Sequence, residues 1–295
     1  MRSLSSNLRG IGLMVIAAGV FVTNDTCMKL AMIDLPPMEV LFIRGLAATI
    51  WCLPLLLALG YGPQLGSVFN RRVLVRNVSE LVAVTAFVIA LSHMPIADIT
   101  AIGQISPLVV LIGASLLFKE KLGLFRTGLI VVGFTGALLV AQPSGSGLSV
   151  YALLGLAGAV ASGVRDVLGR RVPAAIPTLI VAFCVIVMVM LGAGIGTWLF
   201  ETWRTPSARH LVLMAGAGLF LMCGHICIFL AYRTGSARAI APFYYTFAIW
   251  AVLSGLVVFA TIPNPLAIVG IALILCSGVL IVLVDERRRR LLVLA

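Results

Sequence analysis

The stretch "PTLIVAFCVIVMVMLGAGIGTWL" (residues 177–199) decides which class of fold this chain can adopt. It contains no charged side chain, and a helix of this length, rising 1.5 Å per residue, spans the roughly 30 Å hydrocarbon core of a bilayer. Irregular backbone facing lipid would leave amides unpaired, and the stretch is too long and too uniformly apolar for a barrel strand. It therefore predicts a transmembrane α-helix.

Similar stretches follow one another along the whole chain. Hydrophobic residues make up 61% of the 295 positions and charged residues 11%, with a mean hydropathy of +1.16, whereas a soluble domain carries roughly a quarter charged residues. The expected spans are residues 10–32, 37–59, 73–92, 97–118, 123–141, 149–170, 177–199, 209–232, 238–260 and 265–284. The sequence predicts an all-α polytopic membrane protein with ten transmembrane helices.

The basic residues are distributed unequally between the connections. Ten spans put both termini on one side, and most of the 21 Lys and Arg residues fall in connections or termini on that side. Only Arg204 and Arg209 fall on the other side, while Lys29, Arg44 and Arg165 lie inside spans. Cytoplasmic loops carry such an excess, so both termini are expected in the cytoplasm. The net charge of +11 is thus explained by orientation in a lipid bilayer, and no nucleic-acid partner is expected.

The two halves of the chain match each other at a shift of 141 residues, which becomes 142 after a one-residue slip before the glycine pairs. The matched pairs are Asp25 and Asp166, Lys29 and Arg170, Pro36 and Pro177, Ala90 and Ala231, Gly128 and Gly270, and Gly136 and Gly278. Each half holds five spans, an odd number, so the second half must be inverted relative to the first. We expect inverted five-helix repeats over residues 1–142 and 148–295, joined by the linker "AQPSGSG" (residues 141–147). Inverted repeats around a midplane site are typical of secondary transporters.

Several motifs resemble those of one transporter family. They are "PPMEVLFIRGLAA" (36–48), "ALSHMPIADITAIGQISPLVVLIGASLLFKEKLG" (90–123), "GLIVVGFTGALLV" (128–140), "AYRTGSARAIAP" (231–242) and "VGIALILCSGVLI" (269–281). The chain resembles the EamA-type, ten-helix branch of the drug/metabolite transporter superfamily, including the family's acidic residue, here Glu120. The second half departs from the pattern where residues 260–262 replace the corresponding acid. The resemblance implies a bacterial inner-membrane exporter of amino acids and related metabolites, with a cavity lined by spans 1, 3, 4, 6, 8 and 9.

Polar residues interrupt the first span at "FVTNDTCMKLA" (residues 21–31). Ionisable groups at membrane depth are costly, so they face the bundle interior and are functional by default. Asn24, Asp25 and Lys29 are candidates to line the transport path and to offer complementary charges to an ammonium and a carboxylate. Alternatively, Asp25 and Lys29, four residues apart, neutralise each other on one helix face.

Further candidates lie in spans 3, 4 and 8. Glu80 is the most isolated acid and could bind substrate or a proton. His225 could carry a proton, because an unperturbed imidazole titrates near physiological pH; a core histidine bonded to a backbone carbonyl is the alternative. Gln104 lies shortly before Pro107, and this arrangement predicts a locally loosened helix with spare hydrogen-bonding groups.

The stretch "FYYTFAIW" (residues 243–250) places Tyr244 and Tyr245 about 100° apart on a helix. At least one is expected to face the interior, where an aromatic wall suits amphipathic or aromatic solutes and a cation–π contact with an ammonium. Packing against lipid is the alternative. Arg44 is expected to pair with Glu39 or to extend outward. Arg165 and Asp166 are expected to form gating or anchoring ion pairs.

No pattern for a cofactor or metal is present. The six cysteines fall inside spans without a C-x-x-C pair, and neither H-E-x-x-H nor a P-loop occurs. We predict a non-enzyme: a secondary exporter of amino acids, including aromatic ones, or related small metabolites, driven by protons through Glu80 and His225 or by the substrate's own gradient. Two alternatives are a passive channel and an intramembrane enzyme with Asp25 and Asp166 as a dyad. Inversion is expected to place those two acids near opposite membrane faces, which argues against the dyad.

Overall fold

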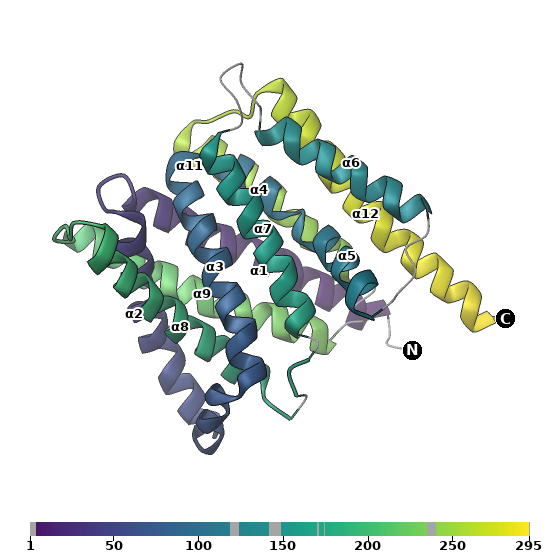
Figure 1. Ribbon diagram of the computed structural model, residues 1–295. Coiled ribbons are helices and arrows are strands. Elements are labelled where there is room, and N and C mark those ends of the chain that lie inside the picture. Colours follow the sequence, from purple (N-terminus) through teal and green to yellow (C-terminus); the bar gives the residue numbers. More distant parts are fainter. Residues whose placement is uncertain are drawn as a thin grey trace.

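The computed structural model describes residues 4–118, 124–141, 149–169, 171–173, 175–234 and 240–294 (Figure 1). Within these ranges the chain is helical and forms no strand. The elements are α1 (Leu4–Ala31), α2 (Pro37–Ala58), η1 (Gly62–Phe69), α3 (Arg71–His93), α4 (Ile96–Gly103), α5 (Ser106–Phe118), α6 (Leu124–Ala141), α7 (Val150–Gly169), α8 (Thr178–Phe200), α9 (Ala208–Thr234), η2 (Ala241–Tyr245), α11 (Thr246–Phe259) and α12 (Pro265–Leu294). The predicted all-α class is confirmed.

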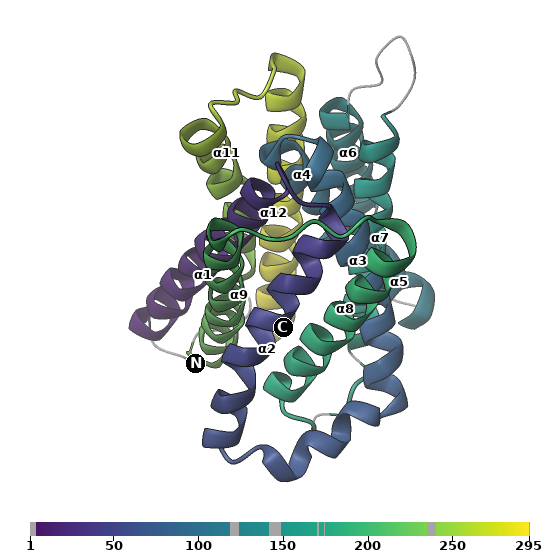
Figure 2. The same ribbon diagram turned by 90° about the vertical axis from the view of Figure 1, so that its left-hand side faces the viewer.

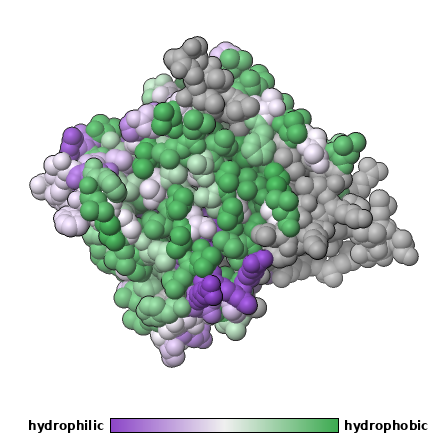
Figure 3. Space-filling model, viewed as in Figure 1, coloured by the Kyte–Doolittle hydropathy of each residue, from purple (hydrophilic) through white to green (hydrophobic). Residues whose placement is uncertain are grey.

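Six of these helices are long and apolar enough to cross a membrane by length and composition, namely α1, α2, α3, α7, α8 and α9. Shorter apolar helices cover the other predicted spans. The outer surface of the bundle is apolar over wide areas (Figure 3), with large side chains such as Trp198, Phe200 and Val257 more than four-fifths exposed. A surface of this kind is stable against lipid rather than water. The protein is therefore a polytopic membrane protein, and the number of ten spans stays a prediction.

Two predicted spans are interrupted. The first breaks at Gln104 and Ile105, which form a turn between α4 and α5, as the loosened helix before Pro107 predicts. Pro107 has no backbone N–H, so the helical ladder cannot run through this point unbroken. The second changes from the 3₁₀ turns of η2 to α11 after Tyr245. The repeat shift of 141 residues carries position 104 onto 245, so the interruptions fall at corresponding places in the two halves.

The main helix pairs join one half of the chain to the other. α1 packs on α9, α3 on α7, α2 on α8, and α6 on α12 (Figures 1 and 2). The pairs are antiparallel: Gly45 lies against Met190, while Gly196, further along α8, lies against Met38 near the start of α2. The shift of 141 residues carries α1 onto α7 and α3 onto α9, so the α1–α9 pair corresponds to the α7–α3 pair. It carries α2 onto α8 and α6 near α12, so each of the other two pairs joins equivalent helices of the two halves.

The two ends of the chain lie at the same end of the molecule, where α1 begins and α12 finishes (Figures 1 and 2). This agrees with an even number of crossings. The acidic residue Glu120, residues 142–147 of the predicted linker, Arg170 and Arg238 lie outside the described residues. So do the boundaries of the two predicted repeats.

Candidate functional site

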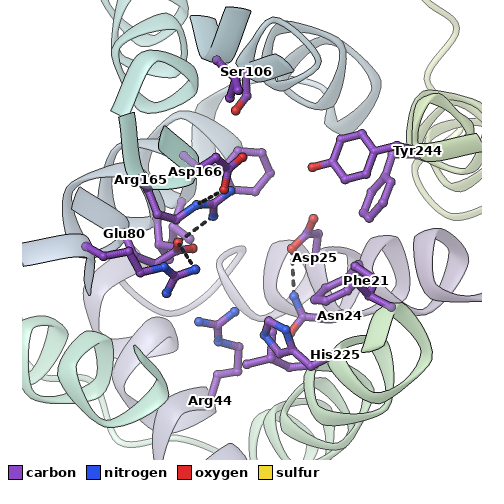
Figure 4. A pocket seen from close by; sticks show the side chains of 18 of the residues that line it. Phe21, Asn24, Asp25, Arg44, Glu80, Ser106, Arg165, Asp166, His225 and Tyr244 are labelled. Carbon is purple, nitrogen blue, oxygen red and sulfur yellow. Dashed lines mark hydrogen bonds and ion pairs between the residues drawn. The ribbon is translucent and has the colours of Figure 1, made fainter. Parts of the chain in front are cut away.

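A cavity of about 650 Å³ lies between the two halves (Figure 4). Its walls come from α1, α3 and α5 of the first half and from α7, α9, η2 and α11 of the second, which matches the six spans expected from the family resemblance. α2 adds one further side chain, that of Arg44. Ser106, at the start of α5, and Tyr245, at the end of η2, both line it, so the two helix interruptions border the same space.

The wall formed by α1 and α9 carries Asn24, Asp25 and His225. The Asn24 side-chain amide Nδ2 donates to Asp25 Oδ1 at 2.8 Å. The ring of His225 lies edge-on to Phe21, with centroids 5.1 Å apart and an interplanar angle of 88°. Asn24 is buried, and its Oδ1 has no hydrogen-bond partner among the described residues. These three predicted residues therefore meet at one place, as candidates for a polar path should.

The opposite wall holds a cluster of ion pairs between α3 and α7. Arg165 Nη1 donates to Glu80 Oε2 at 2.6 Å, and Arg165 Nε donates to Asp166 Oδ1 at 2.9 Å. Arg76 adds a longer contact of 3.7 Å to the same Glu80 oxygen. The predicted ion pair of Arg165 and Asp166 is present, but the expectation that Glu80 is an isolated acid is wrong. Its partner lies 85 residues away and reaches it because α3 and α7 pack together.

Arg44 does not pair with Glu39 and does not extend outward, contrary to both expectations. Its side chain is 7% exposed and points into the cavity from α2 (Figure 4). Glu39 instead accepts from the backbone N–H of Arg204 at 2.9 Å. The reason is geometric: Glu39 lies in the first turn of α2, where the connection between α8 and α9 covers it.

Lys29 makes no ion pair with Asp25 and is not among the residues that line the cavity. Its Nζ donates to the carbonyl oxygens of Leu91 at 2.6 Å and Met94 at 2.7 Å, and lies 5.7 Å from the centroid of the Phe259 ring. Carbonyls in the last turn of a helix lack intrahelical donors, and a lysine can satisfy them. Lys29 therefore caps α3 and ties it to α1.

Gln104 also lies away from the cavity lining. It is buried at the break between α4 and α5, and its Oε1 has no partner among the described residues. The tyrosines both line the cavity: Tyr244 packs on Phe247 with centroids 4.9 Å apart, and Tyr245 lies against Gly278. The interior position expected for at least one of them is thus observed.

Asp25 and Asp166 border the same cavity, although inversion was expected to place them near opposite faces. No hydrogen bond joins the two carboxyl groups in the described part of the chain, because Asp25 accepts from Asn24 and Asp166 from Arg165. A protease dyad requires two carboxyl groups that share a proton. No group of three His, Cys, Asp or Glu side chains that could hold a metal ion occurs among the described residues.

Sequence reasoning missed several lining residues that the structure adds, among them Phe21, Arg76 and Phe247. Arg76 and Glu80 are four residues apart, a spacing that could have indicated their contact. Nothing local to Phe21 or Phe247 distinguishes them from neighbouring packing residues.

Comparison with known proteins identifies the class. A riboflavin transporter of Rhizobium johnstonii is 28% identical over 91% of this chain and 87% of its own length. The pseudopaline exporter CntI of Pseudomonas aeruginosa is 27% identical over 91% and 94%, and an S-adenosylmethionine uptake transporter of Rickettsia prowazekii is 23% identical over 97% and 96%. A crystal structure shares the fold with a TM-score of 0.65 at 19% identity, covering 97% of this chain and 99% of that one.

The fold, the central cavity and these relatives define a polytopic membrane transporter of small metabolites. Residues 8–142 match the model of the EamA-like transporter family. In its first half and in these relatives, the chain is similar to transporters of the drug/metabolite superfamily, the family that its motifs resemble.

Proposed function

We propose that the protein is a secondary transporter that exports amino acids, including aromatic ones, or closely related metabolites by alternating access. The observation that carries this proposal is the cavity between the two halves, bordered by two helices interrupted at corresponding positions. Interrupted helices of this kind mark the substrate site in inverted-repeat transporters. The antiparallel pairing of equivalent helices supports the inverted repeat over residues 1–142 and 148–295.

The walls of the cavity favour a solute that is both charged and apolar. Acidic and basic side chains line it together with Phe21, Tyr244 and Phe247. Such a cavity can bind an ammonium, a carboxylate and an aromatic group at once. The relatives named for riboflavin, pseudopaline and S-adenosylmethionine support an organic metabolite as the cargo, and the last of these compounds is itself an amino-acid derivative.

We place the protein in the bacterial inner membrane with both termini in the cytoplasm. The strong excess of Lys and Arg on the side of the termini supports this orientation. Cavity-lining Arg76 and Arg165 lie near the basic ends of α3 and α7, joined there by the Arg72 Nη1 bond to the Arg171 carbonyl. At the opposite end of α3, the cavity is bounded by Lys29 and by the apolar cluster around Leu91 and Met94.

Driving force comes from protons or from the substrate's own gradient. Of the two predicted proton carriers, His225 lines the cavity and makes no ion pair with any described residue, while Glu80 is engaged by Arg165 and Arg76. A proton on Glu80 would have to displace these contacts, so His225 is the stronger candidate.

The test is counterflow in liposomes that contain the purified protein. Vesicles preloaded with an unlabelled amino acid should accumulate the same radiolabelled amino acid, and accumulation should saturate with concentration. Transport that does not saturate would favour the channel, and the absence of exchange with every amino acid in a panel would exclude this substrate class. Imposing a pH gradient on the same vesicles tests proton coupling, because insensitivity to the gradient would exclude it.

A further inference from the structure

Six charged side chains line the cavity, and four of them are already paired. Arg165 binds Glu80 and Asp166, and Arg76 contacts Glu80, so the α3–α7 wall holds two cations and two anions in mutual contact. Asp25 and Arg44 remain. They are the charges in this cavity that a ligand can reach without breaking an ion pair.

Arg44 is an unusual side chain for this position. It is buried, and within the described part of the chain it makes no hydrogen bond or ion pair, with its Nε fully enclosed. A buried cation without a partner is costly unless something compensates it. Its guanidinium presents a planar fork of donors, the geometry that binds a carboxylate with two parallel bonds.

Acceptors face Arg44 from the neighbouring helix. Asp25 lines the same cavity as Arg44, yet no hydrogen bond joins the two side chains in the described part of the chain (Figure 4). The side-chain oxygen Oδ1 of Asn24 is a second acceptor beside Asp25, and it is buried and without a partner among the described residues. A carboxylate and an amide oxygen form a suitable site for an ammonium, which has three donors to satisfy.

From this arrangement we infer that Arg44 and Asp25 are the two poles of a zwitterion site. Arg44 binds the carboxylate of an α-amino acid, and Asp25, with Asn24, binds its ammonium group. Phe21 and Tyr244 lie beside Asp25 (Figure 4) and contact the substrate's side chain. This inference rests on the proposed function, and it assigns to Arg44 a specificity role in place of a structural one.

The inference predicts a particular pattern of selectivity. A ligand with only one of the two charges leaves the other pole buried and unpaired, so it should bind much more weakly than the amino acid. Phenylalanine, phenethylamine and 3-phenylpropionate provide a matched series, since they share the aromatic ring and differ in which charge they carry.

The experiment measures how each compound inhibits counterflow of radiolabelled phenylalanine in liposomes. For the wild type, phenylalanine should inhibit about 10- to 100-fold more strongly than either single-charge analogue. Arg44→Gln should raise the KM for phenylalanine by a similar factor and leave inhibition by phenethylamine unchanged. Asp25→Asn should do the reverse, weakening phenethylamine and sparing 3-phenylpropionate. Arg44→Lys should recover part of the loss, because it keeps the charge without the fork.

Arg209→Gln is the matched control, since it removes an arginine from an exposed position outside the cavity, and it should leave all three compounds unchanged. If the wild type exchanges phenylalanine but Arg44→Gln weakens all three compounds equally, the assignment of Arg44 is overturned while the transporter stands. If the wild type exchanges no amino acid, the proposed substrate class fails first. Should the Arg44 variants not fold, the wild-type series still decides: equal inhibition by phenethylamine and phenylalanine overturns the zwitterion site.

Discussion

Glu80 and Arg165 show how strongly a buried charge depends on its partner. Their side chains are 12% and 19% exposed, and they meet at 2.6 Å between α3 and α7. Each carries a full charge in surroundings of low dielectric constant. The pair is tolerated because the two charges and their hydrogen bonds compensate each other. Removing one member leaves the other with a weaker partner only, Asp166 for Arg165 and the longer contact with Arg76 for Glu80.

For single residues, we predict that the effects of substituting Glu80 and Arg165 on the stability of the protein are not additive. Glu80→Gln and Arg165→Gln should each destabilise the protein, by up to roughly 3–5 kcal/mol, because the buried charge that remains keeps only a weaker partner. Glu80→Gln/Arg165→Gln should be destabilised by less than the sum of the two. Thermal unfolding in detergent, analysed as a double-mutant cycle, measures the difference.

Arg71→Gln serves as the control, since Arg71 is exposed at the start of α3 and should change stability by no more than about 0.5 kcal/mol. Strict additivity of the Glu80 and Arg165 effects would mean that the ion pair does not contribute.

Helix ends in this protein are tied to neighbouring helices by charged side chains. Glu201, just after α8, accepts from the backbone N–H groups of Met38 at 2.9 Å and Glu39 at 3.0 Å, so it caps the beginning of α2. Lys29 caps the end of α3. A carboxylate at a helix N-terminus and an ammonium at a C-terminus each also complement the helix dipole. These contacts fix where the elements end relative to each other.

Close packing of α6 on α12 depends on Gly136. A Cβ at this position would lie 2.7 Å from the carbonyl oxygen of Gly270 and 3.0 Å from side-chain atoms of Leu273 and Ile274. Since backbone cannot move aside cheaply, Gly136→Ala should destabilise the pair by about 1–3 kcal/mol. The measurement is the melting temperature of the purified protein, together with its yield after membrane extraction.

Gly128 offers a matched control on the same helix, because a Cβ there would meet nothing within 4 Å. Gly128→Ala should be neutral or slightly stabilising, as alanine favours the helix by up to about 1 kcal/mol. Equal effects of the two substitutions would show that helix contact is not what limits stability here.

The molecule as a whole is closed at one end of its cavity. Thr26 of α1 and Ser254 of α11 have their hydroxyl oxygens 2.6 Å apart, and Lys29 holds α1 to the end of α3 nearby. Alternating access requires the two halves to separate at this end so that the cavity can open there. A contact between α1 of the first half and α11 of the second is therefore expected to break once in every transport cycle.

Cross-linking this contact should stop transport. In a variant lacking the six native cysteines, Thr26→Cys/Ser254→Cys should form a disulfide under mild oxidation and lose counterflow, because the closed end can no longer open. Reduction should restore the activity. Each single cysteine variant should transport at the same rate before and after oxidation. A fully cross-linked protein that still exchanges substrate would exclude alternating access through this end.

Much of the architecture was predictable, and the reason is that it depends on local properties. The apolar stretch at 177–199 needs only its own composition to become the helix α8, which spans Thr178–Phe200. The loosened helix near Gln104 was predictable because Pro107 lacks an N–H whatever surrounds it. An interior position for one of the tyrosines at 244 and 245 was predictable because neighbouring residues of any helix point in different directions, which also holds for the 3₁₀ turns of η2.

The partners of the charged side chains were predicted poorly. Four residues separate Asp25 from Lys29 and five separate Glu39 from Arg44, but neither pair forms, because each helix turns these side chains toward different neighbours. Lys29 reaches the end of α3, and Glu39 meets the connection after α8. Only the correct packing of several helices determines which alternative has the lower free energy.

Taken by itself, the sequence determined that the chain is helical and lies in a membrane, since hydrophobicity and backbone hydrogen bonding act within each segment. The tertiary structure decided which charges neutralise one another and which remain free in the cavity. Electrostatic partners are chosen by distances of a few ångströms between residues far apart along the chain, and those distances exist only after the two halves have packed together.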